Sequence, residues 1–440
     1  MLPRISAPRL IILGFAGFIL IGTVLLKLPM SHYGGISWLD ALFEAASAVT
    51  VTGLQVVTPA TDFTPFGQVV LVFLIQVGGL GIMTAATVGA LLVGRQLGFR
   101  ELLIVREELQ SPGTPRNILR LLGQIALITF LLETVGIVFF AVDFLFRGFG
   151  LAKALWSATF HSVSAFCNAG FDIFQPDERA YAGDAVVSLT FVFLIVAGGL
   201  GFPVLVNLYY YPKIRRLSLH SKLVLVPTAV LLVVGILSVA TLEWTNPATL
   251  GGEPFGTKVL QSIFQGTTPR TAGFSTVEYA DLRESTLVTQ IALMFVGVGP
   301  ASTGGGIKVT TLAIIFLIFL SQVRGEEEVS AFGRRLPRSL IARALSVSAL
   351  AALLLVIGTV ALLISDGMGF LRTAFEVVSA FGTVGLSVGE ATKDFGAFGK
   401  LLLVLIMFAG RVGPVTLILA LNERTRPKRY TYPEEEIALG

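Results

Sequence analysis

The stretch "FEVVSAFGTVGL", residues 375–386, recurs three more times in changed form along the chain. The other copies are "FEAASAVTVTGL" at 43–54, "FHSVSAFCNAGF" at 160–171 and "IFQGTTPRTAGF" at 263–274. Ser or Thr stands at the fifth letter of every copy, at Ser47, Ser164, Thr267 and Ser379. A glycine follows ten residues after each first letter, at Gly53, Gly170, Gly273 and Gly385. Repeats at a regular spacing indicate one structural unit used several times.

A second match follows each of these segments about 25 residues later, which strengthens the case for a repeat. The four copies read "QVGGLGIMT" from Gln76, "VAGGLGFPV" from Val196, "VGVGPASTGGGIKV" from Val296 and "FAGRVGPVT" from Phe408. Two independent matches at one offset predict four copies of a unit of roughly 110 residues. Each unit would be a span, a short outer segment and a second span.

The composition is that of a membrane protein. Charged residues make up only 14% of the 440 residues and hydrophobic residues 54%, whereas soluble domains carry about 25% charged residues. Runs of about 20 apolar residues predict transmembrane spans. Eight are expected, over residues 10–29, 69–93, 118–142, 186–208, 222–242, 286–320, 341–365 and 398–421. The length of the first run, with no A-x-A-like site after it, favours a span over a signal peptide.

Basic residues are distributed unevenly between the two sides that eight spans define. Of the 32 Lys and Arg residues, 20 fall on the side of both termini and eight on the other. The positive-inside rule therefore places both termini in the cytoplasm of a multi-pass plasma (inner) membrane protein. The tail at 422–440 has basic residues followed by an acidic run. That pattern fits either anchoring at the membrane surface or a docking site for a cytosolic partner.

Each short outer segment is too short to cross the bilayer and is expected to be a re-entrant half-helix followed by a returning loop. Irregular backbone at membrane depth survives only where protein or a water-filled cavity satisfies it. We therefore predict an all-α membrane protein with four parallel helix–pore loop–helix repeats around one central pore. The expected units are 1–93, 94–208, 209–322 and 323–421, followed by the tail at 422–440.

Four such loops around one axis could form an ion filter. Glycine permits positive φ and close approach of the backbone, and a ring of carbonyls can replace the hydration shell of an alkali cation. The alternative is a set of packed hairpins with no conduction role. The predicted potassium-binding filter residues are Thr50, Val51, Thr52, Gly53, Cys167, Asn168, Ala169, Gly170, Arg270, Thr271, Ala272, Gly273, Gly382, Thr383, Val384 and Gly385. They contain no carboxylate ring, which argues against a calcium filter.

The motifs "TVTG", "TPRTAGF", "STGGGIK" and "GRVGP" make the chain resemble the Trk/Ktr/HKT superfamily of potassium transport proteins along nearly its whole length. Because the first pore loop directly follows the first span, the chain is most similar to the KtrB-type membrane subunit. The resemblance implies potassium as substrate, no cofactor in the chain and a homodimer with one pore per protomer. It also implies a cytosolic nucleotide-binding (KtrA-type) regulatory ring, with membrane lipid around the protein and no nucleic acid. Whether sodium acts as an activator stays open.

The stretch "VGVGPASTGGGIK" is expected to interrupt the second span of the third unit just below the filter. Glycines and a proline break helices, so this part can sit in the aqueous path as a flap, and the resemblance implies the same. The predicted gating residues are Gly297, Gly299, Pro300, Ser302, Thr303, Gly304, Gly305, Gly306, Lys308 and Arg411. We expect the broken helix to occur only in this unit.

Two charges near the flap and one in the filter need partners, since a charge at the bilayer centre should face a cavity or a counter-charge. Lys308 and Arg411 either donate to loop carbonyls or form an electrostatic barrier to cations, and Arg411 is expected to contact the flap. Arg270 cannot point at a cation axis without repelling the ion. It is expected to point behind the filter to a carboxylate, with Glu44, Glu133 and Glu376 as open candidates.

The sequence leaves two possible classes of function. The first is potassium uptake through a gated, filter-based, channel-like pathway; the alternative is a secondary transporter that couples sodium or protons to uptake. Transporters use inverted repeats, whereas every unit here begins on the same side, and the spans carry no Asp/Glu chain. Nothing supports an enzyme: the histidines are isolated, Cys167 is the only cysteine, and "STGGGIK" lacks the βαβ context of a phosphate-binding loop.

Overall fold

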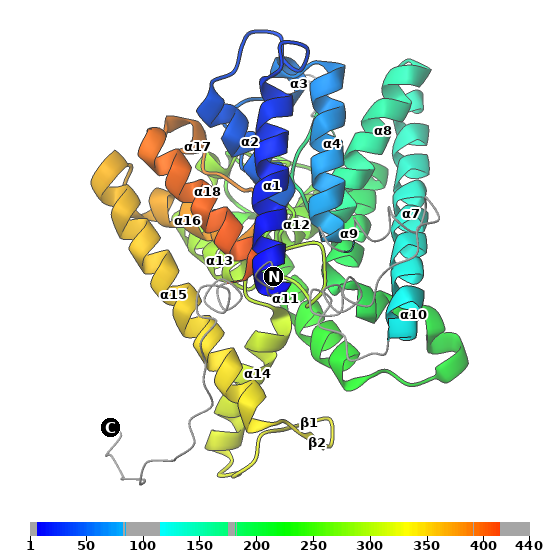
Figure 1. Cartoon of the computed structure of the whole chain (residues 1–440), viewed down its shortest axis with the longest axis vertical. Helices are drawn as coiled ribbons and strands as arrows, with labels where there is room; N and C mark the ends of the chain where they lie inside the picture. The colour runs from blue at the N-terminus through cyan, green and yellow to red at the C-terminus, as the bar shows by residue number, and fades with distance from the viewer. Residues whose placement is uncertain are drawn as a thin grey trace, which may run out of the picture.

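The computed structural model describes residues 7–81, 84, 115–174, 181, 183–389 and 391–413, and these form a bundle of helices (Figure 1). The predicted tail at 422–440 and most of the basic segment 94–120 lie outside the described residues. Within them, four helices are long and apolar enough to cross a membrane, or five if one bent pair counts as a span.

The helices follow one order that repeats four times. Each repeat begins with a long helix, and the four are α1 (Ala7–Lys27), α7 (Pro115–Phe146), α11 (Leu219–Glu243) and α15 (Arg338–Asp366). Each is followed by a short helix: α2 (Trp38–Thr50), α8 (Leu151–Phe166), α12 (Phe255–Thr267) and α16 (Phe370–Gly382). A second helix then follows: α4 (Pro65–Leu80), α9 (Ala185–Leu200), α13 (Glu284–Phe295) and α18 (Ala397–Val412).

The remaining elements connect or extend these helices. Short turns lie at α3 (Pro59–Asp62), η2 (Tyr279–Asp281) and α17 (Ala391–Asp394). Two further helices, α10 (Phe202–Ile214) and α14 (Val309–Val323), continue the second and third units. The strands β1 (Ser330–Ala331) and β2 (Arg334–Arg335) pair antiparallel between α14 and α15.

The short helices pack in a closed cycle. Each lies against the long helix of its own unit: α2 on α1, α8 on α7, α12 on α11 and α16 on α15. Each also packs against the second helix of the unit before it: α8 on α4, α12 on α9, α16 on α13 and α2 on α18. The last pair joins the fourth unit to the first, so the contacts return to their starting point and the short helices lie inside the bundle.

The prediction that residues 186–208 form one continuous span is wrong, and so is the prediction of a single broken helix. The helix stops at Leu200, and α10 leaves at 102° to α9. The break is at Gly201, whose φ of 90° and ψ of 143° are accessible mainly to glycine. Gly81 and Gly413, at the matching places after α4 and α18, have nearly the same conformation.

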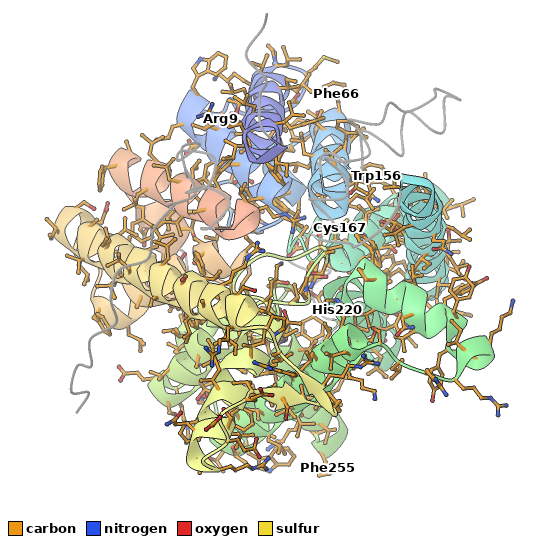
Figure 2. The ribbon with its side chains drawn as sticks, turned by 60° about the horizontal axis from the view of Figure 1, so that its bottom comes forward. Arg9, Phe66, Trp156, Cys167, His220 and Phe255 are labelled. Atoms are coloured by element: carbon orange, nitrogen blue, oxygen red, sulfur yellow. The ribbon has the colours of Figure 1, made fainter. Side chains whose placement is uncertain are left out.

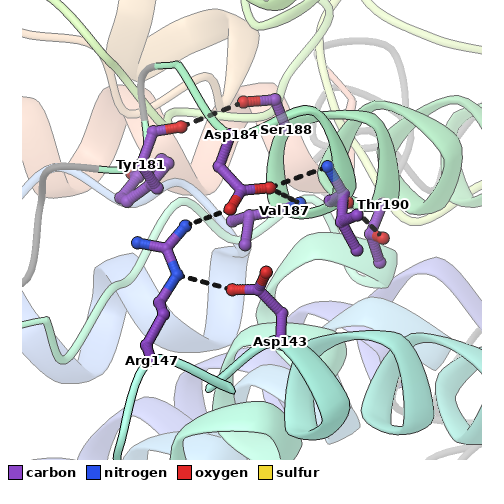
Figure 3. Close-up of polar contacts among 8 residues, drawn as sticks. Asp143, Arg147, Tyr181, Asp184, Val187, Ser188 and Thr190 are labelled. Carbon is purple, nitrogen blue, oxygen red and sulfur yellow. Dashed lines mark hydrogen bonds and ion pairs between the residues drawn. The ribbon is translucent and has the colours of Figure 1, made fainter. Parts of the chain in front are cut away.

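Polar contacts fix one junction between helices (Figure 3). Arg147, just after α7, donates from Nε to Asp143 at 2.6 Å and from Nη2 to Asp184 at 2.5 Å. Asp184 also caps α9 by accepting from the Val186 and Val187 amides. Partial burial acts to raise the pKa of Asp184, but these amides and the Arg147 guanidinium outweigh it and hold that pKa below its usual value.

Candidate functional site

The four predicted filter segments share one unusual backbone conformation. They begin where α2, α8, α12 and α16 end. Two residues before each glycine, a non-glycine residue has positive φ: Val51 at 57°, Asn168 at 58°, Thr271 at 63° and Thr383 at 51°. Positive φ is rare for β-branched residues, and such strain costs on the order of 1–3 kcal/mol per residue. The same conformation at four matched positions, three of them β-branched residues, indicates that the surrounding packing imposes it.

The four matched glycines close into a ring. Their φ values are 88° at Gly53, 71° at Gly170, 78° at Gly273 and 90° at Gly385. A Cβ atom added at each glycine would meet the carbonyl oxygen that precedes the glycine of the next unit. The pairs are Gly53 with Ala169 at 2.4 Å, Gly170 with Ala272 at 3.0 Å, Gly273 with Val384 at 2.5 Å and Gly385 with Thr52 at 2.3 Å. The structure therefore brings all four segments to one place, in chain order.

Side chains of the filter segments are buried and bond to one another. Asn168 Nδ2 donates to the Arg270 carbonyl at 3.2 Å and to Thr271 Oγ1 at 3.1 Å, which links the second unit to the third. In the first unit the Thr50 and Thr52 hydroxyls lie 2.8 Å apart. Cys167, close to the centre of the bundle in Figure 2, is fully buried. These side chains support the ring from behind.

A second layer of polar side chains was not predicted from the sequence. Each short helix carries one buried acceptor that binds the amide three residues after the filter glycine. The pairs are Glu44 Oε1 with Val56 at 2.7 Å, His161 Nε2 with Ile173 at 3.3 Å, Gln265 Oε1 with Thr276 at 2.8 Å and Glu376 Oε1 with Val388 at 3.1 Å. The Gln265 amide is oriented here so that both its ends are satisfied. We call these four residues the loop anchors.

In the first, second and fourth units, the predicted Ser/Thr residue bonds to the filter loop. In the third unit the next residue along the chain makes this bond instead. Ser47 and Ser379 accept from the amides of their filter glycines at 3.0 and 3.1 Å, and Ser164 donates to the carbonyl just after its glycine at 2.7 Å. In the third unit Thr268 makes that last bond, at 2.5 Å, while Thr267 bonds within its own helix. Comparison letter by letter misses this shift and with it the anchor Gln265.

Residues 297–306, the predicted flap, form a loop between α13 and α14 whose two ends meet. Val296 pairs with Ile307 in a parallel bridge, and the Val309 amide donates to the Val298 carbonyl at 3.1 Å. The loop therefore leaves and re-enters the bundle at one place. These ten residues are closed into a loop by backbone bonds rather than continued as a helix.

The flap binds the other units directly beside the filter segments. Its contacts are Gly299 N with the Gly199 carbonyl at 2.9 Å, Phe202 N with the Ala301 carbonyl at 2.9 Å, Thr303 Oγ1 with Asn168 Oδ1 at 3.1 Å and Gly305 N with Thr383 Oγ1 at 2.8 Å. A Cβ atom at Gly304 would lie 2.2 Å from Thr271 Oγ1. Three of the four residues with positive φ thus touch the flap, so no space separates flap and filter there.

Both predicted flap cations donate to carbonyl groups. Lys308 Nζ donates to the Gly304 carbonyl at 2.8 Å, which lies within the same loop. Arg411 donates to the Thr303 carbonyl of the flap and to the Gly78 carbonyl of the first unit, and its Nη2 lies 3.4 Å from the Gly79 carbonyl. The predicted contact between Arg411 and the flap is confirmed, and Arg411 ties three units together.

The predicted carboxylate partner of Arg270 is wrong. The buried guanidinium donates from Nη1 to the Val296 carbonyl at 2.7 Å, and its Nε and Nη2 have no partner among the described residues. Glu44 and Glu376 are occupied as loop anchors, and Glu133 lies beside Gln76. A backbone carbonyl at the broken end of α13 takes the place expected for a carboxylate, and sequence alone does not show where free carbonyls lie.

Comparison with known proteins gives consistent results. Residues 15–427 match the TrkH family model, described as a cation transport protein. The chain is 39% identical over 437 residues to the Ktr system potassium uptake protein B of Bacillus subtilis, covering 99% of this chain and 97% of that protein. It is 35% identical to the potassium/sodium uptake protein NtpJ of Enterococcus hirae, covering 99% and 98%. The crystal structure of the potassium transporter TrkH from Vibrio parahaemolyticus has the same fold, with a TM-score of 0.70 at 23% identity over 93% of this chain and 84% of that chain.

Proposed function

This chain belongs to the TrkH family of cation transport proteins, and from that premise we propose that it takes up potassium through a gated, channel-like pathway. The names of its near full-length relatives describe uptake of potassium, or of potassium and sodium. Those relatives are transport proteins, and we assign no catalytic reaction to this chain. The proposed pathway crosses the plasma membrane through one pore at the centre of the four units.

The closed ring of four glycines is the observation that carries this proposal. Each glycine lies against the carbonyl that precedes the next glycine, so any side chain would collide with the ring. Backbone carbonyls held close together around one axis can replace the water of a potassium ion. The short helices also end at the ring, and their C-terminal ends carry the partial negative charge that favours a cation.

The loop anchors explain how such a ring could keep its dimensions. Each anchor holds the returning loop at the third residue after the glycine, and each is buried on its short helix. Hydrogen bonds in a water-poor interior are strong, and an unmade one is costly. We propose that the anchors hold the carbonyls at the spacing that potassium requires and that a smaller ion does not satisfy.

We propose that residues 297–306 are the gate. The loop contacts Asn168, Thr271 and Thr383 directly beside the ring, so an ion leaving the ring would meet it. Short glycine-rich backbone can change conformation at low cost. Arg411 and Lys308 hold the loop through its carbonyls, so their loss would favour the open loop.

The assembly proposed from the sequence extends this pathway beyond one chain. The name of the Bacillus subtilis relative describes that protein as protein B of a Ktr system. We propose that this chain forms a homodimer, that both termini are cytoplasmic, and that a cytosolic nucleotide-binding ring controls the flap. The basic side of the chain, which faces the cytoplasm under the positive-inside rule, would meet that ring.

Cation flux into proteoliposomes that hold only this chain tests the pathway. Potassium, rubidium, sodium and lithium would be compared under an imposed membrane potential for the wild type, Gly273→Ser and Gly252→Ser. Gly273 lies in the ring, where an added Cβ atom would be 2.5 Å from the Val384 carbonyl, whereas Gly252 has no atom within 4 Å of such a position. Gly252→Ser is therefore a matched control.

The proposal expects fast, potassium-selective flux that Gly273→Ser abolishes or makes unselective and that Gly252→Ser leaves unchanged. Slow flux that requires a sodium or proton gradient would instead support coupled secondary transport. If the wild type showed no flux, the measurement would be repeated on a variant in which residues 299–306 are shortened. If flux stayed absent with the flap shortened and the protein folded, the channel-like pathway would be wrong.

A further inference from the structure

Helix α10 projects from the bundle at the foot of α9 and across the foot of α7 (Figure 1). It leaves α9 at 102°, so if α9 crosses the membrane, α10 runs nearly parallel to the membrane plane. Gln124 of α7 donates to Tyr210 Oη at 2.7 Å. Asn207 Oδ1 accepts from the Ser218 amide at 3.0 Å and from the Ser221 hydroxyl at 2.8 Å. One face of α10 is thus fixed to the protein.

Outside these contacts, α10 exposes aromatic and apolar side chains beside basic ones. Tyr209 is 63% exposed, Tyr211 45% and Ile214 55%. Lys213 lies in the last turn of the helix, which ends at Ile214, and Arg215 and Arg216 follow it; all three basic residues are exposed. Tyrosine is enriched where membrane meets water, and long basic side chains extend from that level toward lipid headgroups. Nitrogen-tipped side chains project from the free end of α10 in Figure 2.

Among the described residues, these basic side chains have no counter-charge. The sequence contains no Asp or Glu between Asp184 and Glu243. Within the described part of the chain, Lys213, Arg215 and Arg216 form no ion pair. A set of cations on a helix that lies at the membrane surface complements anionic lipid.

We propose that the exposed surface of α10, together with the two arginines that follow it, is a binding site for anionic phospholipid headgroups. The phosphate groups would lie against Lys213, Arg215 and Arg216, and the rings of Tyr209 and Tyr211 would lie at the level of the headgroups. A docked soluble protein is the less favoured occupant, because α14 and the β1–β2 hairpin extend further from the bundle than α10 does (Figure 1). Those elements would meet a soluble partner first.

The same helix is bonded to the flap, so lipid bound to α10 would affect the position of the flap. Phe202, the first residue of α10, donates its amide to the Ala301 carbonyl at 2.9 Å. One residue earlier, a Cβ atom at Gly201 would lie 2.5 Å from the Pro300 carbonyl. Lipid that fixes α10 therefore fixes one side of the flap. This coupling rests on the proposed role of residues 297–306 as the gate, whereas the lipid site does not.

Hydrogen–deuterium exchange in nanodiscs tests the site with the full chain. The discs contain phosphatidylcholine alone or with increasing phosphatidylglycerol, and exchange is followed at residues 203–217 and 297–308. The test variant is Arg215→Gln/Arg216→Gln. The matched control is Arg334→Gln/Arg335→Gln, another exposed arginine pair at the same end of the bundle, on the β1–β2 hairpin.

The proposal expects phosphatidylglycerol to protect residues 203–217 in the wild type and in the control pair. In the test variant, half-maximal protection should need at least roughly tenfold more phosphatidylglycerol, because two lipid-facing cations are lost. Three results would overturn the lipid site. The wild type and both double variants could be protected equally, the two double variants could lose protection equally, or protection could require a soluble partner protein. Protection of α10 without any change at 297–308 would overturn the coupling alone. Neither exchange measurement depends on cation flux. A failure of the proposed transport function would appear only in the flux assay and can therefore be distinguished from a failure of the lipid site.

Discussion

Replacing Arg411 by alanine should open the pathway. The Arg411 side chain donates to the Thr303 carbonyl of the flap and, on its other side, to the Gly78 carbonyl of the first unit. Lys308 donates only to the Gly304 carbonyl within the same loop. Arg411 is thus the cation that ties the flap to a neighbouring unit, and its removal should favour the conformation in which the flap leaves the filter.

The size of the effect follows from the bond that holds the flap. A hydrogen bond between a charged donor and a carbonyl contributes about 1.5–3 kcal/mol. Since about 1.4 kcal/mol changes an equilibrium tenfold, losing the Arg411–Thr303 bond should raise the ratio of open to closed flap about 10- to 150-fold. The bond to Gly78 orients Arg411 and does not add to this figure.

Potassium flux into proteoliposomes measures the change. Arg411→Ala should raise the initial rate of potassium flux in the absence of any regulatory partner. The rise can reach the change of about 10- to 150-fold in the ratio of open to closed flap, unless the flux of a fully open pathway is reached first. Arg324→Ala is the control, because Arg324 is an exposed arginine at the end of α14, away from the flap. Lys308→Ala should raise the rate less than Arg411→Ala.

Three results would refute this reasoning. If Arg411→Ala folded normally and left flux and its regulation unchanged, the contact would not hold the gate. If the variant lost discrimination between potassium and sodium without a rise in rate, Arg411 would act on the filter through the first unit. An equal rise in Lys308→Ala would show that the shape of the loop, rather than its tie to another unit, keeps it closed.

Two further predictions concern stability. Glu376→Ala should lower the free energy of unfolding by about 1–3 kcal/mol, because the buried Val388 amide and Thr392 hydroxyl lose their acceptor; exposed Glu278→Ala should change it by less than about 0.5 kcal/mol in the same thermal denaturation. Asp184→Asn should destabilise the chain at neutral pH, because the folded pKa of Asp184 lies below the unfolded value of about 3.9. That stability is present above the unfolded value and is lost as the pH falls through the folded pKa, so the two melting curves should converge in acid. A difference that persists in strong acid would show that the carboxylate charge is not the cause.

The place of the four filter segments could be predicted because each glycine is conformationally required. A side chain at any of them would meet a carbonyl of the next unit, so the same letter recurs at a fixed distance from a Ser/Thr position in every copy. Helix–turn geometry of this kind depends on local sequence, and local sequence is what repeat comparison detects. The four matched copies therefore indicated both the short helices and the loops that follow them.

The break at Gly201 could not be predicted because its cause lies in another unit. The run from Phe191 to Val206 is continuously apolar, and hydropathy does not distinguish a straight helix from a bent one. The carbonyl of Gly199 and the amide of Phe202 are satisfied by Gly299 and Ala301 of the flap. Backbone groups freed by a helix break need such partners, and a sequence shows them only after the fold has brought them together.

The third unit departs from the other three at its anchor and in its filter segment. Its anchor, Gln265, lies one residue nearer the glycine than its counterparts do. Its filter segment carries Arg270, whose guanidinium donates to the carbonyl of Val296, the residue between the end of α13 and the flap. A buried guanidinium with a single bond would be costly in a purely structural role, yet here it joins the filter segment to the residue that precedes the flap. Arg270 N is itself bonded within the filter turn, at 3.0 Å from the Thr267 carbonyl. Displacement of the chain at Val296 would therefore pull on the third filter segment, and displacement of the flap at Thr303 and Gly305 would pull on the second and fourth. We therefore expect the shape of the filter and the position of the flap to be coupled through these contacts.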